Sequence, residues 1–422
     1  MRVDLAFGKT GMAVDLPAGF DYSVLEVRSA QPLPDALAAI EAALDHPIDS
    51  PSLFALARGK KTAAISVCDI TRPAPNKLTL PPVLKRLHAA GIPVEGVRIC
   101  IATGLHRIAT PAEIVEILGA DIAAKYQIVN HQAKNLADHR YLGTTAAGTP
   151  VHIDEQFVSA DLHITLGFVE PHLMLGFSGG RKLIAPGLAA AETIKVIHSP
   201  KFMRDPRAVE GSIADNPLHR ELLEVARMAR HDFLCDVVLA RDRQVAAVFA
   251  GHAEKAHARG MEFVSQVMLQ ELAGKVDAVI TTCAGYPLDL TFYQAVKGVT
   301  AASHIVKPGG RILIVAACDE GPGAPEFCDM IKRHPNDKKF LDAIAQAPVV
   351  VDQWQLEKLA LISTRFQVHF FTPGLPQEFR PSLWGPAYDT AQAAVAGLLS
   401  GLPPGATVAV IPEGPYVLAR AA

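Results

Sequence analysis

The fold class follows from residues 61–103, which read KTAAISVCDITRPAPNKLTLPPVLKRLHAAGIPVEGVRICIAT. Its two ends, 61–69 and 97–103, are short apolar runs that predict buried strands. Between them, residues 81–91 predict a helix that Pro82 opens and Gly91 closes. The same alternation continues outward, with predicted helices over 32–45 and 111–119 and a predicted strand over 161–168. Alternating strands and helices of this kind predict an α/β protein.

A second run of the same alternation begins near residue 275. Its predicted elements are strands over 277–282, 311–317 and 367–371 and helices over 293–303, 325–333 and 352–360. This order is typical of a compact, Rossmann-like parallel-sheet domain. A long helix over 254–272 precedes it and is the expected connector, because a chain of 422 residues is too long for one simple core. We predict an N-terminal domain over residues 1–268 and a C-terminal domain over residues 275–385.

The tail of the chain predicts a helix over 389–401 and a strand over 407–414. A lone strand at the end of a chain must join an existing sheet. We expect residues 388–422 to return to the N-terminal domain and complete it.

The composition indicates a globular protein whose partner is a small molecule. Half of the residues are hydrophobic and 20% are charged, which is ordinary for a globular chain. A formal net charge of −3 gives no field that gathers nucleic acid or anionic lipid. No apolar run reaches the roughly 18 residues that a membrane helix needs, and residues 1–4 do not begin a secretion signal. We therefore expect neither a nucleic-acid nor a membrane partner.

The six cysteines are scattered along the chain, mostly inside apolar runs, and no two form a C-x-x-C pair. This spacing favours buried thiols over a disulfide framework or a zinc site. Free thiols persist in a reducing compartment. We therefore expect a cytoplasmic protein.

Two polar clusters follow the first two predicted strands, where parallel sheets bind ligands. Asp69 and Arg72 lie in the segment DITRP, and His106 lies in ATGLHR. Arg72 offers a planar fork that matches a carboxylate, with Asp69 available to hold it. Histidine is the usual general acid or base near neutral pH, which makes His106 a candidate for that role. For the first cluster alone, a surface salt bridge beside a turn-forming proline is an equally open explanation. For the second cluster alone, a structural histidine is the more common explanation.

The densest cluster is EPHLMLGFSGGRKLIAPG, residues 170–187, which includes His172. Its segment Ser178-Gly179-Gly180-Arg181-Lys182 offers close backbone approach, amide donors and two cations, which suit a phosphate or a nucleotide. It is not a P-loop, because Leu183 stands where Ser or Thr is required. His198 follows in a helical stretch and is a candidate for a single metal ligand. An ordinary glycine-rich turn is the less favoured explanation, because so many reactive residue types fall together.

A fourth cluster, FYQAVKG, spans residues 292–298. On a helix, Tyr293 or Gln294 shares a face with Lys297. Such a face suits a hydroxy acid, although a plain solvated face has equal weight. Trp354, one of two tryptophans, is either a core residue or a pocket wall.

Together these motifs resemble the nickel-dependent lactate racemase family, whose members are 2-hydroxy-acid racemases and epimerases. The matching pieces run in order from DITRP through ATGLHR, residues 170–187, His198 and FYQAVKG to Trp354, and so cover nearly the whole chain. The resemblance implies two α/β domains with the active site in the cleft between them. It also implies a nickel-pincer nucleotide, a pyridinium-3-thioamide-5-thiocarboxylic acid mononucleotide carrying Ni(II), and host proteins that make this cofactor.

The resemblance further implies a role for each matched residue. Lys182 is covalently joined to the cofactor, and His198 supplies the protein ligand of nickel. His106 and His172 form the acid/base pair, supported by Asp69. The loop residues expected to bind the cofactor are Ser178, Gly179, Gly180 and Arg181. The residues expected to line the substrate or the cofactor are Arg72, Tyr293, Gln294, Lys297 and Trp354.

The chemistry accounts for these residue types. The α-hydrogen of a 2-hydroxy carboxylate is a poor acid, whereas its loss as hydride, with the hydroxyl proton going to a base, gives a neutral ketone. The cofactor ring is electron-poor and can hold that hydride. Return to the opposite face requires an acid/base on each side, hence two histidines.

Two other functions stay open on the residues alone. One is an NAD- or S-adenosylmethionine-dependent enzyme, since residues 306–316, VKPGGRILIVA, resemble a late strand of Rossmann-like methyltransferases. Against it, residues 279–289 lack the motif G-x-G-x-x-G. The other is a non-catalytic anion-binding protein, which leaves His106, His172 and His198 without a role.

Overall fold

The structure is a computed structural model that describes residues 1–421. The chain forms two compact units, and each is assembled from segments that are separate in the sequence. The six-stranded unit comprises residues 29–197 and 207–267, and the five-stranded unit comprises residues 1–28, 198–206 and 268 onward. Both units are α/β assemblies with a mainly parallel sheet, which confirms that the protein is of the α/β class.

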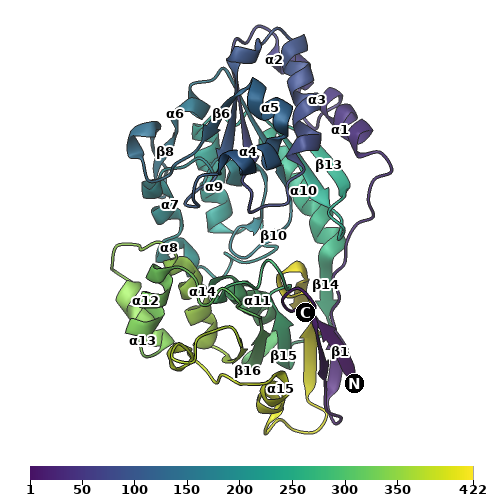
Figure 1. Ribbon diagram of the computed structural model, residues 1–422, viewed down its shortest axis with the longest axis vertical. Helices are drawn as coiled ribbons and strands as arrows, with labels where there is room; N and C mark the ends of the chain where they lie inside the picture. Colours follow the sequence, from purple (N-terminus) through teal and green to yellow (C-terminus); the bar gives the residue numbers. More distant parts are fainter. Residues whose placement is uncertain (422) are drawn as a thin grey trace. The chain divides into compact units, whose positions relative to one another are not determined.

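One sheet, in the order β13-β12-β9-β4-β5-β6, forms the centre of the six-stranded unit (Figure 1). Its strands are β4 (Ala63–Cys68), β5 (Val97–Ala102), β6 (Gln127–Asn130), β9 (Leu162–Phe168), β12 (Phe233–Leu239) and β13 (Val245–Gly251). Neighbouring strands are parallel except for β12 and β13. β4 and β9 are buried along their whole length, as expected for parallel strands covered on both faces. The predicted strands over 61–69, 97–103 and 161–168 are therefore confirmed.

Helices flank this sheet, and the same unit contains two short β-hairpins. The helices are α1 (Ala36–Asp45), α2 (Leu53–Ala57), α3 (Asn76–Ala89), α4 (Pro111–Leu118), α5 (Ala120–Lys125), α6 (Glu155–Val158), α7 (Ala191–Ile197), α9 (Pro217–Met228) and α10 (Ala253–Met268). The hairpins pair β7 (His139–Thr144) with β8 (Pro150–Asp154) and β10 (Pro171–His172) with β11 (Gly176–Phe177). The predicted start of one helix was wrong, because α3 begins at Asn76 and Pro82 lies inside it. Burial of Leu80, Val83 and Leu87 offsets the helix hydrogen bonds that an interior proline removes.

The five-stranded unit is built around a fully parallel sheet in the order β17-β16-β15-β18-β3. Its strands are β3 (Asp21–Val24), β15 (Val276–Thr282), β16 (Val306–Val315), β17 (Gln367–Phe371) and β18 (Thr407–Ile411). Its helices are α8 (Pro200–Met203), α11 (Phe292–Ser303), α12 (Pro325–Arg333), α13 (Asp337–Ile344), α14 (Gln353–Ser363) and α15 (Ala391–Leu399). Two further strand pairs belong here: β1 (Arg2–Leu5) with β2 (Met12–Asp15), and β14 (Leu269–Leu272) with β19 (Leu418–Ala421).

The predicted domain boundaries differ from these units in three places. The tail does not complete the N-terminal domain, because β18 lies between β15 and β3 in the five-stranded sheet. Residues 1–28 and 198–206 also belong to the five-stranded unit. The helix predicted over 254–272 ends at Met268, because the next residues pair with β19 as a strand. Each difference arises from contacts between segments far apart in the chain. The local sequence pattern does not show which distant strand a segment pairs with.

The helices of residues 1–421 include none that is both long enough and apolar enough to cross a membrane.

The place of the tail can be tested with one buried residue in each sheet. Ile411 of β18 is fully buried in the core around β15 and β16. Ile411→Ala should cost about 2–5 kcal/mol, the usual penalty for truncating a buried isoleucine. Hydrogen exchange should then accelerate in β15 and β16 and leave β4 and β5 unchanged. The matched variant Ile65→Ala in β4 should give the reverse pattern. Faster exchange in β4 of the Ile411→Ala variant would contradict the assignment of the tail to the five-stranded unit.

Candidate active site

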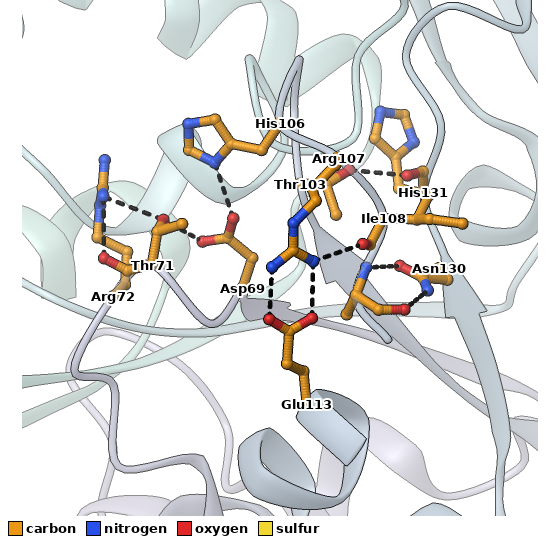
Figure 2. A network of polar contacts seen from close by, with 11 residues as sticks. Asp69, Thr71, Arg72, Thr103, His106, Arg107, Ile108, Glu113, Asn130 and His131 are labelled. Carbon is orange, nitrogen blue, oxygen red and sulfur yellow. Dashed lines mark hydrogen bonds and ion pairs between the residues drawn. The ribbon is translucent and has the colours of Figure 1, made fainter. Parts of the chain in front are cut away.

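Two loops at one edge of the six-stranded sheet bring Asp69 and His106 together. β4 and β5 are adjacent and parallel, so the segments that follow them emerge at the same edge. Asp69 directly follows β4, and His106 lies in the turn after β5. The two side chains point toward each other in Figure 2, and His106 Nδ1 lies 2.7 Å from Asp69 Oδ2.

Asp69 is an ionised carboxylate inside the protein. Its residue is only 6% exposed, and Thr71 Oγ1 donates to its second oxygen at 2.7 Å. Burial raises the pKa of Asp69, but the hydrogen bonds from His106 and Thr71 and the charges of His106 and Arg72 outweigh it and hold that pKa below its ordinary value. A carboxylate only accepts, so Nδ1 of His106 carries a proton. The other ring nitrogen, Nε2, is then the basic one in the neutral ring, and 51% of this side chain is exposed.

Arg72 reaches Asp69 through Thr71. Its Nη1 donates to both the backbone carbonyl and the hydroxyl of Thr71, each at 3.1 Å. The expected support of the guanidinium by Asp69 is therefore indirect, because Thr71 and His106 take the carboxylate oxygens. Sequence reasoning missed Thr71, although a hydroxyl two residues after a strand-end aspartate is a common local acceptor and donor.

The neighbouring Arg107 has a structural role. It forms two parallel bonds with Glu113 at 2.7 and 2.6 Å (Figure 2). Glu113 also closes a capping box with Thr110 at the start of α4. This arrangement fixes the end of the loop that carries His106.

The turn that carries His106 is also tied to the segment after Lys182. Gly104 adopts a left-handed φ of +55°, which glycine accommodates without strain. Its N–H donates to the carbonyl of Gly187 at 2.9 Å. A backbone hydrogen bond therefore links the His106 turn to the glycine-rich cluster.

Lys182 lies in a short 3-10 helix over Gly180–Leu183, on one face of the sheet. The N–H of Gly180 donates to Asp236 of β12 at 2.8 Å, and Ser66 Oγ of β4 donates to the carbonyl of Leu183 at 2.8 Å. Sequence reasoning missed both Asp236 and Ser66. The only available signal was a polar residue inside each apolar strand.

Two side chains of the predicted cofactor loop face the protein. Ser178 Oγ donates to the carbonyl of Phe168 and accepts from the N–H of Glu170, both at 3.0 Å. Arg181 is 1% exposed, and its guanidinium donates to the carbonyl of Leu175 at 3.0 Å. Burial lowers the pKa of Arg181 to about 9. Both side chains therefore hold the loop from inside.

Lys182 is half-buried, and its charge acts on the same thiol as that of Arg72. Burial raises the pKa of Cys68, at the end of β4, to about 12, while the charges of Arg72 and Lys182 act in the opposite direction. The two cations therefore lie in one neighbourhood at the strand end.

His172 lies in the short β10–β11 hairpin and is partly buried. Its Nδ1 accepts from the N–H groups of Met174 and Leu175, at 3.4 and 3.3 Å. Both contacts are long, so they favour only weakly the neutral ring with its proton on Nε2. His106 has the opposite tautomer, with its proton on Nδ1.

The other predicted residues belong to the five-stranded unit. The rings of His198 and Trp354 lie 4.6 Å apart between centroids, so the candidate nickel ligand packs on the buried tryptophan. Tyr293 and Gln294 lie in the first turn of α11, and the carbonyl of Tyr293 accepts from the side-chain amide of Gln355 at 2.9 Å. The charge of Lys297 acts on Cys283, whose pKa burial raises to about 12.

The donor set fits a cofactor that brings its own soft ligands. Within residues 1–421, no three His, Cys, Asp or Glu side chains gather as a metal site. A nickel ion would need its other ligands from a bound group, and the pincer nucleotide implied by the motifs carries a carbon and two sulfurs for this purpose. The raised pKa of Cys68 keeps this thiol neutral, so it is a poor competing ligand beside Lys182. Such a group would need one imidazole from the protein, and His198 is the candidate that the motifs give.

Comparison with known proteins assigns the chain to a family. Residues 7–211 match the lactate racemase N-terminal domain, and residues 272–419 match the lactate racemase C-terminal domain. The lactate racemase of Thermoanaerobacterium thermosaccharolyticum is 34% identical over 425 residues, covering 99% of each chain. That of Lactiplantibacillus plantarum is 35% identical over 384 residues, covering 90% of each. The chain belongs to the lactate racemase family. It is an isomerase of the racemase class.

Solved structures agree with this assignment. The lactate racemase apoprotein of T. thermosaccharolyticum superposes with a TM-score of 0.91, at 32% identity and full coverage of both chains. A protein from Thermotoga maritima gives a TM-score of 0.69 at 18% identity, covering 93% of this chain and 100% of its own, and shares the fold. The match of both halves to one family favours the racemase over an NAD- or S-adenosylmethionine-dependent enzyme or a non-catalytic anion-binding protein.

Removing the His106 ring tests the electrostatics of Asp69. His106→Ala takes away the strongest interaction that lowers the pKa of Asp69 and leaves the burial that raises it. The pKa of Asp69, read from the pH dependence of its ¹³Cγ shift, should therefore rise. Because the folded-state pKa of Asp69 is lowered, its carboxylate contributes stability that is lost as pH falls from the unfolded-state pKa to the folded-state pKa. The rise in the folded-state pKa should therefore make the part of the acid-side decline in unfolding free energy that comes from Asp69 smaller in the variant, and it should end at higher pH. The control Arg107→Ala should leave the Asp69 titration nearly unchanged, and an equal shift in both variants would contradict the pairing.

Proposed function

We propose that this chain racemises or epimerises a small 2-hydroxy carboxylate of the lactate kind. The observation that carries the proposal is the buried Asp69 carboxylate bonded to the half-exposed ring of His106. This pair lies on loops tied to the segment that holds Lys182. The relatives at 34–35% identity are lactate racemases, which supports the substrate class.

The proposed cofactor is the nickel-pincer nucleotide, joined to Lys182 and with His198 as the protein ligand of nickel. When bound, it supplies an acceptor that takes the α-hydrogen with its electron pair and returns it. Host proteins that make the cofactor are the proposed partners. All six cysteines are free and five are buried, which is compatible with the proposed cytoplasmic location.

His106 is the proposed base for one enantiomer. Its Nε2 accepts the proton of the substrate hydroxyl, and the Asp69 carboxylate stabilises the imidazolium that forms. Asp69 also fixes the tautomer, because it can only accept from Nδ1. Without it, the ring gains a second tautomer whose Nε2 is a donor.

His172 is the proposed acid/base for the opposite face. It serves as an acid once its ring is protonated, and the two long contacts to Nδ1 must then open. Their weakness keeps the cost of opening small. In that direction the reaction begins with a neutral His106, which accepts the hydroxyl proton of the substrate, and a protonated His172, which donates a proton to the product.

Arg72 is the proposed carboxylate-binding residue. Its bonds to Thr71 both use Nη1, which leaves Nε and Nη2 for two parallel bonds to a substrate carboxylate. The proposed supporting residues, assigned from the family motif, are Tyr293, Gln294, Lys297 and Trp354. Together they would hold the carboxylate while the neighbouring carbon inverts.

The proposed tether is tested by Lys182→Ala. The variant should be inactive and should retain no covalent cofactor, because the bond is made by the side-chain nitrogen. Intact mass of protein produced together with the cofactor-making proteins is the measurement. Lys195→Ala, at an exposed lysine of α7, is the control and should keep the adduct. An active wild-type preparation with the mass of the bare chain would refute the tether.

The two-sided role of the histidines is tested with His106→Ala and His172→Ala. Each loaded variant should still oxidise the enantiomer whose hydroxyl faces the surviving histidine, and should lose racemisation in both directions. Rapid quench with each pure enantiomer should therefore show transient keto acid from one enantiomer only, with opposite preferences in the two variants. A shared preference would mean that the histidines do not serve opposite faces.

A further inference from the structure

Asp236 is a fully buried acid beneath the loop that carries Lys182, and no motif named it. It lies in the middle of β12, opposite Gly167 in the parallel pairing with β9. Its Oδ2 accepts from the N–H of Gly180 at 2.8 Å. The proposed mechanism assigns no role to this carboxyl group.

Glycines leave the space that this carboxyl group fills. A Cβ at Gly167 would lie 2.9 Å from Oδ1 of Asp236 and 2.7 Å from the side chain of Leu183. A Cβ at Gly179 would lie 2.6 Å from Oδ2. Gly179 and Gly180 both have left-handed φ values, +80° and +47°, which other residues adopt only at a cost. The loop backbone therefore closes around the carboxyl group at a distance that only glycine permits.

A second strand anchors the other side of Lys182. Ser66 of β4 is fully buried, and its hydroxyl donates to the carbonyl of Leu183 at 2.8 Å. Gly180 and Leu183 flank Lys182, so the main chain on each side of the lysine is bonded to a different strand of the sheet. Such bonds restrict the backbone from which the Lys182 side chain extends.

The charges agree with this arrangement. Burial raises the pKa of Asp236 to about 7, while the N–H groups of Gly180 and Gly167 and the charge of Arg181 act in the opposite direction. Oδ1 of Asp236 and Nε of Arg181 are both buried without a hydrogen bond. An acid needed only to neutralise Arg181 would bond to the guanidinium, whereas this one bonds to the loop backbone.

We propose that Asp236 is a positioning residue which, together with Ser66, fixes the Gly179–Leu183 backbone so that the Lys182 amine is held for covalent attachment of the cofactor. The attachment itself rests on the proposed function. The anchoring of the loop does not, and it can be measured in the cofactor-free protein.

The test combines hydrogen exchange of the cofactor-free protein with intact mass after production with the cofactor-making proteins. Asp236→Ala should speed exchange in peptides spanning residues 176–188 about tenfold, the scale of one lost buried hydrogen bond. Asp236→Asn keeps one acceptor oxygen and should recover part of the protection. If the Asp236 variants fold poorly, Ser66→Ala provides the test in their place, because it removes only a single hydroxyl. It should speed exchange in the same peptides. The adduct on Lys182 should fall in parallel with the lost protection.

Asp232→Asn is the matched control, because Asp232 lies directly before β12, the strand that contains Asp236. Asp232 precedes β12 and accepts from the N–H of His163 at 2.9 Å, away from the lysine loop. The Asp232→Asn variant should show faster exchange only in peptides around His163 and should keep the full adduct on Lys182. Unchanged exchange over 176–188 in both Asp236→Ala and Ser66→Ala, or faster exchange with a complete adduct, would overturn the proposal. An active wild-type protein without any adduct would instead refute the proposed tether at Lys182, and the exchange results would still decide whether Asp236 and Ser66 anchor the loop.

Discussion

The hydrogen bond between Asp69 and His106 is the interaction on which the site depends. It joins two loops that are far apart in the chain and adjacent only because β4 and β5 pair in parallel. Burial alone would push Asp69 toward its neutral acid, which could donate to the ring and reverse its tautomer. The charges and donors around the carboxylate prevent this, so the sheet pairing determines which nitrogen of His106 is basic.

The need for hydrogen-bond partners also shapes the glycine-rich loop, residues 176–187. A polar backbone segment that lies on a sheet face must find partners for its N–H and C=O groups. Asp236 and Ser66 provide them from two different strands, and Arg181 and Ser178 turn inward to bond the loop to its surroundings. Lys182 lies between the two residues of this loop whose main chain is bonded to the sheet. The glycines are thus required by the acid beneath them as well as by the turn.

Much of the architecture could be predicted because local patterns carry it. Apolar runs between 61 and 103 identified β4 and β5, and their ends located Asp69 and His106. The motifs also gave the family, because six short pieces in one order are far more specific than any one alone. Patterns of this kind depend only on neighbouring residues, which a sequence displays directly.

What could not be predicted depends on residues that meet through the fold. Nothing in TVAVIPEG indicates that β18 inserts between β15 and β3, since any parallel strand has the same apolar pattern. Asp236 lies in FLCDVVL, where an acid in an apolar strand is equally compatible with a bulge, a buried ion pair or an anchor. Its role emerges only when Gly167, Gly179 and Gly180 are seen around it, although they are contributed by another strand and a distant loop. The glycines of the proposed cofactor loop therefore need not report contact with a cofactor, because a carboxyl group of the protein itself already requires them.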